Sequence, residues 1–238
     1  EELASQIRSL GGENDAPSRN ISRYLASLAD RLDIGLDVMQ VWRNDRFGRG
    51  GDHTEFLNAG FPAVRLSVPV ENYNWQHQDL RTENGIEYGD TIERMDFPYL
   101  RRVTALNVAA LAALARAPMP PAPRVDGAVS TSTTLLWDPV PGAFDYVIRW
   151  RRTNGSGWEH RVRAAQSGNY TLTSWSGREA GTDRRAGGMH AAVALPGIRV
   201  DDWVLGVSSV SADGYESPVA SAVPGGALGP STPPPAQL

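Results

Sequence analysis

The chain has 238 residues, 41% of them hydrophobic and 21% charged, a composition typical of a folded globular protein of one or two domains. Its net charge of −4 offers none of the basic surface that nucleic-acid binding needs, so we expect no nucleic-acid partner. The absence of cysteine excludes disulfides and thiolate metal sites, and any metal must be bound by His, Asp or Glu. The most apolar stretch is well short of the roughly 20 residues of a membrane span, so we expect no transmembrane segment.

The first element is predicted to be a helix over residues 17–32, where apolar residues recur at helical spacing. Asp15 or Ser18 is suited to cap it. Gly35 ends the helix, and residues 36–42 are predicted to form a strand. A helix followed directly by a strand is half of an α/β repeat.

A glycine-rich run over residues 48–56 contains Asp52 and His53. It leads into a short helix predicted over residues 54–59, and residues 62–68 then have the pattern of a second strand. A glycine loop that presents such a pair at a helix start is typical of ligand sites in open α/β sheets. Two plainer interpretations stay open: Asp52 as the helix cap, and His53 as a histidine that hydrogen-bonds its own loop.

A long polar connection over residues 69–89 contains His77, with Trp75 and Asp79 two residues to either side. Loops of this length in compact domains are usually functional or disordered. His77 is therefore a candidate metal ligand, and the alternative is a surface histidine. Trp75 is a candidate for a hydrophobic pocket wall, although aromatic residues in such places often only pack.

A second helix is predicted over residues 96–116, and a proline-rich stretch follows it. We therefore divide the chain into a first domain over residues 1–117, a linker over 118–124, a second domain over 125–224 and a disordered tail over 225–238.

The second domain has the alternating pattern of an antiparallel β-sandwich. Strands are predicted over residues 133–137, 144–152, 190–195 and 203–211. Residues 164–188 give no clear pattern and are interpreted as a long insertion.

Five short patterns of the first domain occur in a characteristic order: Gly51–Phe56, Gly60–Ala63, His77, Asp90–Asp96 and the helix that ends near Arg116. In this order they resemble the C-terminal portion of the cocatalytic zinc exopeptidases, which include bacterial leucyl aminopeptidases, glutamate carboxypeptidase and, more distantly, glutaminyl cyclase. The expected fold class is α/β: a partial zinc-exopeptidase sheet domain, followed by an all-β sandwich.

The resemblance implies that His77 is a zinc ligand, and that Asp52 and His53 line the substrate pocket or orient the ligands. Asp79 and Asp90 are both candidates for the aspartate that follows the ligand histidine in the family. Two zinc ions are implied for the complete enzyme. Their other ligands and the general-base glutamate lie upstream in the family, so no catalytic residue is assigned here and we expect this chain to be an inactive C-terminal part of a larger enzyme.

The second domain resembles a fibronectin type III module. The matching positions are Trp137, Tyr146, Leu195–Pro196, Trp203–Val207, Gly214 and Ser217–Pro218. Such modules usually supply spacing or binding, so contact with a protein or a polysaccharide is the expected role. By analogy with the family, we expect a secreted or periplasmic protein.

The function implied for the parent protein is zinc-dependent hydrolysis of N-terminal residues from peptides. In that chemistry two zinc ions lower the pKa of a bridging water and polarise the scissile carbonyl. One alternative is a non-catalytic binding or adhesion protein of the same fold. Another is an acyltransferase of the glutaminyl cyclase kind, which cyclises N-terminal glutamine.

Overall fold

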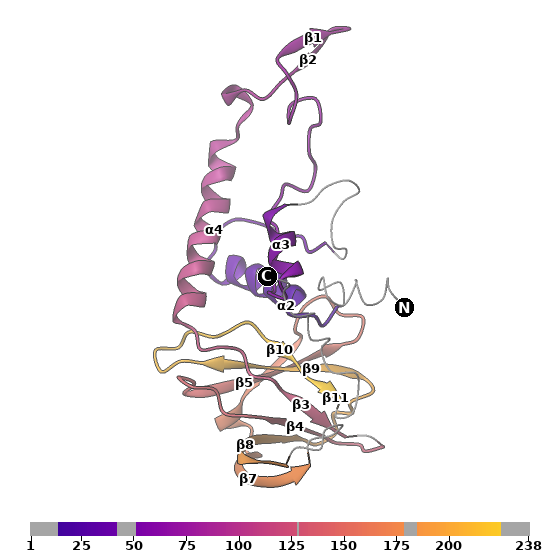
Figure 1. The fold of residues 1–238 in the computed structure, drawn as a ribbon, viewed down its shortest axis with the longest axis vertical. Helices are drawn as coiled ribbons and strands as arrows, with labels where there is room; N and C mark the ends of the chain where they lie inside the picture. Colours follow the sequence, from indigo (N-terminus) through magenta and orange to yellow (C-terminus); the bar gives the residue numbers. More distant parts are fainter. Residues whose placement is uncertain (1–13, 42–50, 128, 179–184, 225–238) are drawn as a thin grey trace.

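The computed structural model describes residues 14–41, 51–127, 129–178 and 185–224. Figure 1 shows the arrangement of the chain, with a sandwich of strands below and a long helix rising from it. The first part contains helices α2 (Pro17–Arg31) and α3 (Asp52–Asn58), strands β1 (Arg81–Glu83) and β2 (Ile86–Tyr88), the 3-10 helix η1 (Ile92–Arg94) and helix α4 (Phe97–Arg116). The second part contains β3 (Arg124–Asp126), β4 (Thr133–Trp137), β5 (Asp145–Arg152), β6 (His160–Arg163), η2 (Ala164–Gln166), β7 (Tyr170–Arg178), β8 (Arg185–Leu195), β9 (Trp203–Val210), β10 (Ala220–Ser221) and β11 (Val223–Pro224).

Helices α2 and α4 form the core of the first part, and both predictions of a helix are confirmed. Leu25, Leu28 and Ala29 of α2 pack with Leu106 and Ala110 of α4 in one buried cluster. Leu25 and Leu28 are among the residues whose helical spacing predicted α2, and burial of one side of each helix stabilises the pair.

The cap predicted for α2 is wrong. The N-cap is Ala16, and no side chain caps it. Ser18 lies inside the helix, where its hydroxyl accepts a hydrogen bond from the Ala63 N–H at 3.2 Å. Helix α4, in contrast, is capped by Asp96, whose carboxylate accepts from the Tyr99 N–H at 2.9 Å.

The strands predicted over residues 36–42 and 62–68 are not formed where the structure describes these segments, and Trp42 lies outside the described residues. Both segments are extended but pair with no strand of the described part. Strand formation needs a hydrogen-bonding neighbour, which a sequence pattern does not supply. The α/β class therefore holds only as a mixture of helices and strands, and the described residues of the first part form no parallel sheet.

The polar connection over residues 69–89 contains a two-stranded hairpin that the sequence analysis missed. Strands β1 and β2 pair antiparallel around Asn84 and Gly85, with φ of 52° and 79°. Two residues with positive φ define the type I′ turn that Asn-Gly favours. The hairpin lies beyond the N-terminal end of α4 (Figure 1).

The second part is a β-sandwich, as the alternation predicted. One sheet has the order β10-β9-β5-β6 and the other β11-β3-β4-β8-β7, with antiparallel pairing except between β3 and β11. Their facing sides share one core, which includes Leu135, Trp137, Ile148, Val193 and Val207, all fully buried.

The interpretation of residues 164–188 as an insertion is wrong within the described part. Strand β7 and the first half of β8 occupy most of this stretch and pair antiparallel. Strand β6 was also missed. In β7 and in residues 185–188 of β8, glycine, serine, threonine and arginine outnumber apolar residues, so the hydrophobic alternation there is weak.

Between the two parts, residues 118–123 form no helix or strand, and β3 begins at Arg124. Among the described residues, no helix combines the length and apolar character needed to cross a lipid bilayer. The predicted disordered tail over residues 225–238 and the glycines before Gly51 lie outside the described residues.

Candidate functional site

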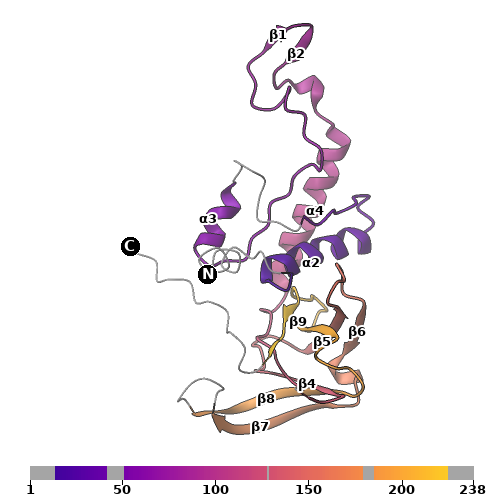
Figure 2. The ribbon, with the colours of Figure 1, turned by 90° about the vertical axis from the view of Figure 1, so that its right-hand side faces the viewer.

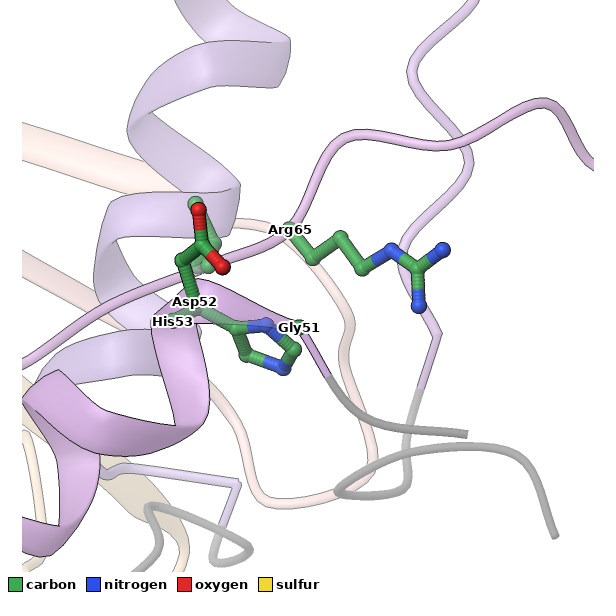
Figure 3. Close-up of a pocket in the computed structure, with 5 residues that line it drawn as sticks. Gly51, Asp52, His53 and Arg65 are labelled. Atoms are coloured by element: carbon green, nitrogen blue, oxygen red, sulfur yellow. The ribbon is translucent and has the colours of Figure 1, made fainter. Parts of the chain in front are cut away.

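A cavity of about 350 Å³ lies at the start of helix α3. Its lining residues are Gly51, Asp52, His53, Val64 and Arg65. Figure 3 shows Asp52 and His53 at the start of α3 and Arg65 on the neighbouring extended segment. A carboxylate, an imidazole and a guanidinium thus border one opening, although the Arg65 side chain extends away from Asp52 and His53 (Figure 3). These groups can meet both donor and acceptor groups of a polar ligand.

Gly51 makes room for the His53 ring. The backbone of Gly51 is extended, with φ of −179°, so glycine is not needed for its conformation. A Cβ atom at this position would lie 2.9 Å from His53 Nδ1 and 3.5 Å from Arg65 Cδ. The missing side chain therefore allows the imidazole to lie against the backbone at the mouth of the cavity.

We expect the Gly51→Ala substitution to displace the His53 ring, because a carbon–nitrogen contact of 2.9 Å is shorter than van der Waals contact. The measurement is the chemical shift of the His53 imidazole protons by NMR. Gly157→Ala is the matched control, since nothing lies within 4 Å of a Cβ atom there. Unchanged His53 resonances in Gly51→Ala would contradict the packing described.

Asp52 does not cap helix α3, which corrects one of its two interpretations. The helix begins at Asp52, and its N-cap is Gly51 without a side-chain hydrogen bond. Asp52 and Glu55 lie in the first helical turn, where negative charge is stabilised by the helix dipole. The carboxylate of Asp52 is exposed and borders the cavity.

A second cavity of about 250 Å³ lies where the polar connection meets η1. Val68, Trp75 and Met95 supply an apolar part of its wall, and Glu71 and Asp90 supply two carboxylates. The structure therefore places Trp75 and Asp90 together, apart from the first cavity, with which this one shares no lining residue.

Arg94 organises this second cavity and was missed by the sequence analysis. Its guanidinium lies 5.1 Å from the centre of the Trp75 ring, donates to the Gly89 carbonyl at 2.6 Å and pairs with Glu87 at 3.3 Å. These contacts join the turn that precedes His77 to the stem of the hairpin. The only signal in the sequence was its place inside the Asp90–Asp96 pattern, which assigns no role to it.

His77 and Asp79 line neither of the two cavities, and both are exposed. His77 follows a turn in which the N–H groups of Trp75 and Gln76 bond to the Asn72 carbonyl. Its φ of 55° is in the left-handed region, which few residues other than glycine adopt. A held left-handed conformation at a histidine is consistent with a functional constraint.

The described residues do not make a complete zinc site. A catalytic zinc takes three protein ligands, and the described part of the chain holds no group of three His, Asp or Glu side chains placed to bind a metal. His77 offers one imidazole to solvent. The described residues can therefore supply one ligand to a zinc site, but they do not form a zinc site by themselves.

Comparison with known proteins gives similarity over most of the chain. No protein-family model matches it. It is 37% identical over 226 residues to a protein of Pyrenophora tritici-repentis, covering 93% of this chain and 42% of that protein. It is 37% identical over 227 residues to one of Leptosphaeria maculans, covering 94% and 47%, and 34% identical over 237 residues to one of Pyricularia oryzae, covering 94% and 42%.

All three of these proteins are named probable zinc metalloproteases, and the chain spans less than half the length of each. Among solved structures, one of Astrotactin-2 matches with a TM-score of 0.30 and 13% identity, covering 43% of this chain and 20% of that one. That likeness supports no inference about fold or function.

Proposed function

We propose that this chain is one part of a longer zinc-dependent metallopeptidase. The observation that carries the proposal is 34–37% identity over more than nine-tenths of the chain to proteins named probable zinc metalloproteases. Because those proteins are more than twice as long as the matched part, the remaining metal ligands and the general base are assigned to the rest of the protein.

Within this proposal the activity is that of an aminopeptidase, which removes N-terminal residues from peptides. The ordered patterns from Gly51 to Asp96 support this finer assignment through their resemblance to the cocatalytic zinc exopeptidases. His77 is proposed as one ligand of a two-zinc centre. Asp52 and His53 are proposed to meet the substrate at the first cavity, where they stand with Arg65.

The full-length protein, purified with zinc, is expected to hydrolyse peptides with a free N-terminus and to leave the same peptides uncut when that amine is acetylated. A chelator should abolish the hydrolysis, and added zinc should restore it. Measurement of released amino acids distinguishes the outcomes. Cleavage of acetylated peptides at internal bonds would retain the metallopeptidase and overturn the aminopeptidase.

Two other outcomes would overturn the proposal more widely. Release of ammonia from N-terminal glutamine without peptide cleavage would indicate glutaminyl cyclisation. A full-length protein that binds no zinc and cleaves no peptide would indicate the non-catalytic binding protein. The 238-residue chain alone is the control and is expected to be inactive, since one exposed imidazole does not hold a catalytic metal.

Two further assignments belong to the same proposal. We assign the protein to the secreted or periplasmic space by analogy with the zinc exopeptidases. The sandwich, proposed as a fibronectin type III-like module, is assigned contact with a protein or a polysaccharide.

A further inference from the structure

Helix α2 lies between the sandwich and the segments that lead to the first cavity. In both Figure 1 and Figure 2 the helix crosses the base of α4, next to the sheet that contains β5, β9 and β10. One side of α2 therefore faces the sandwich, and another faces the first part of the chain. The polar residues on these two sides make the contacts that follow.

On the sandwich side, two buried residues of α2 bond directly to the second part. Asn20, 1% exposed, donates from Nδ2 to the Ser221 hydroxyl at 2.9 Å. Arg23, 4% exposed, donates from Nε to the Ser156 carbonyl at 2.6 Å. Removing the partner of a buried polar group lowers the stability of the folded protein. Both hydrogen bonds therefore stabilise the packing of α2 against the sandwich.

Arg23 and Arg151 also share an acceptor. The Asn14 carbonyl accepts from Arg23 Nη1 at 2.7 Å and from Arg151 Nη2 at 3.3 Å, and Arg151 is fully buried in β5. Burial, with the charges of Arg151 and Arg19, lowers the pKa of Arg23 to about 10. Arg23 is still protonated at neutral pH, and backbone carbonyls compensate these buried cations.

A glycine in β9 allows strand β10 to present Ser221. Gly206 is paired with Ser221 in the antiparallel register. A Cβ atom at Gly206 would lie 2.5 Å from Val219 Cγ1 and 2.8 Å from the Ala220 carbonyl oxygen. Only a residue without a side chain allows this close approach, which sets the position of the hydroxyl that Asn20 meets.

On the other side, α2 bonds to both extended segments of the first part. The Ser18 hydroxyl accepts from the Ala63 N–H at 3.2 Å, and Ala63 immediately precedes Val64 and Arg65 of the cavity wall. Arg19 donates to the Val41 carbonyl, at the end of the segment that leads toward Gly51. Helix α2 is thus hydrogen-bonded both to the sandwich and to the wall of the first cavity.

We propose that Asn20 and Arg23 are positioning residues, through which the sandwich fixes the wall of the first cavity by way of helix α2. The sandwich is then a structural part of the candidate site as well as a module that can bind elsewhere. This coupling does not depend on the reaction that the complete protein catalyses, and its test uses no substrate.

The test is amide hydrogen exchange of the full chain, followed over residues 61–66 in the wild type and in Ser221→Ala. This substitution lies in the sandwich and removes only a hydroxyl. We expect exchange of the Ala63 amide to become about tenfold faster, as for the loss of one buried hydrogen bond that holds a local structure closed. Arg23→Ala should have a larger effect, and Arg23→Lys, which keeps the charge, an intermediate one.

Arg101→Ala is the matched control, because Arg101 is an exposed arginine of α4 that should leave exchange at Ala63 unchanged. If Arg23→Ala fails to fold, Ser221→Ala alone decides the outcome. Faster exchange at Asn20 and Arg23 with unchanged exchange over residues 61–66 would overturn the coupling. Loss of peptidase activity plays no part in this readout, so the coupling and the proposed function can fail separately.

Discussion

Replacing Trp137 by alanine should lower the free energy of unfolding of the sandwich by about 3–5 kcal/mol. Trp137 is fully buried at the end of β4, and its ring lies 5.2 Å from that of Tyr146 and 6.3 Å from that of Tyr170. Removal of the indole leaves a cavity between two sheets that cannot collapse without breaking their pairing. Urea unfolding of the full chain, monitored by circular dichroism, measures the loss.

Phe144→Ala is the control for this substitution. Phe144 is a large aromatic residue of the same sandwich, but it is 79% exposed, so its removal should change stability by no more than about 0.5 kcal/mol. A loss below about 1 kcal/mol in Trp137→Ala would mean that the indole does not fill the core between the two sheets.

The elements that the sequence predicted correctly are mainly those that bury apolar residues in a shared core. Helix α2 was predicted from residues such as Leu25 and Leu28, which are buried against Leu106 of α4, so periodicity and burial agree there. Helix α4 was also predicted correctly, although Leu100 and Leu111 of its apolar stretch are 42% and 70% exposed. Two strands of the sandwich were predicted for the same reason: they contain the buried residues Leu135, Trp137 and Ile148. Alternating apolar residues are typical of a strand with one buried face.

The strands predicted over residues 36–42 and 62–68 are not formed in the described part of these segments, because strand pairing is not a local property. Their sequences are largely apolar, yet Met39 is 71% exposed, Val41 58% and Val68 41%. Exposed apolar side chains on extended segments favour a covering partner.

The sequence indicates individual candidate residues for the site but not how they are arranged: His77 and Asp79, for example, line neither cavity. The patterns identified Asp52 and His53, which line the first cavity, and Trp75, which lines the second. They did not identify Arg94, because its contacts with Trp75, Glu87 and Gly89 depend on how the turn and the hairpin fold, which no motif specifies. The sequence does contain a signal for the missed hairpin, because the dipeptide Asn84-Gly85 strongly favours a hairpin turn.

Replacing His77 in the full-length protein should lower zinc content and reduce peptidase activity by about 100-fold or more, because a catalytic zinc depends on each of its few ligands. Asparagine is the better replacement. The φ of 55° at this position would strain alanine, whereas asparagine adopts the left-handed region readily and binds zinc poorly. His77 is exposed, so His77→Asn should keep the stability of the folded chain. Metal analysis of the dialysed protein and peptide hydrolysis are the measurements.

His160→Ala is the control for the loss of an exposed histidine. His160 lies on β6 of the sandwich, where its ring stacks on Trp150 at 5.2 Å, and its removal should leave zinc content unchanged. His53→Ala separates two roles: a substrate-pocket residue should lose activity and retain zinc, whereas a ligand should lose both. Unchanged zinc content in His77→Asn would remove His77 from the metal site and leave Asp52 and His53 as the residues by which this chain meets the substrate.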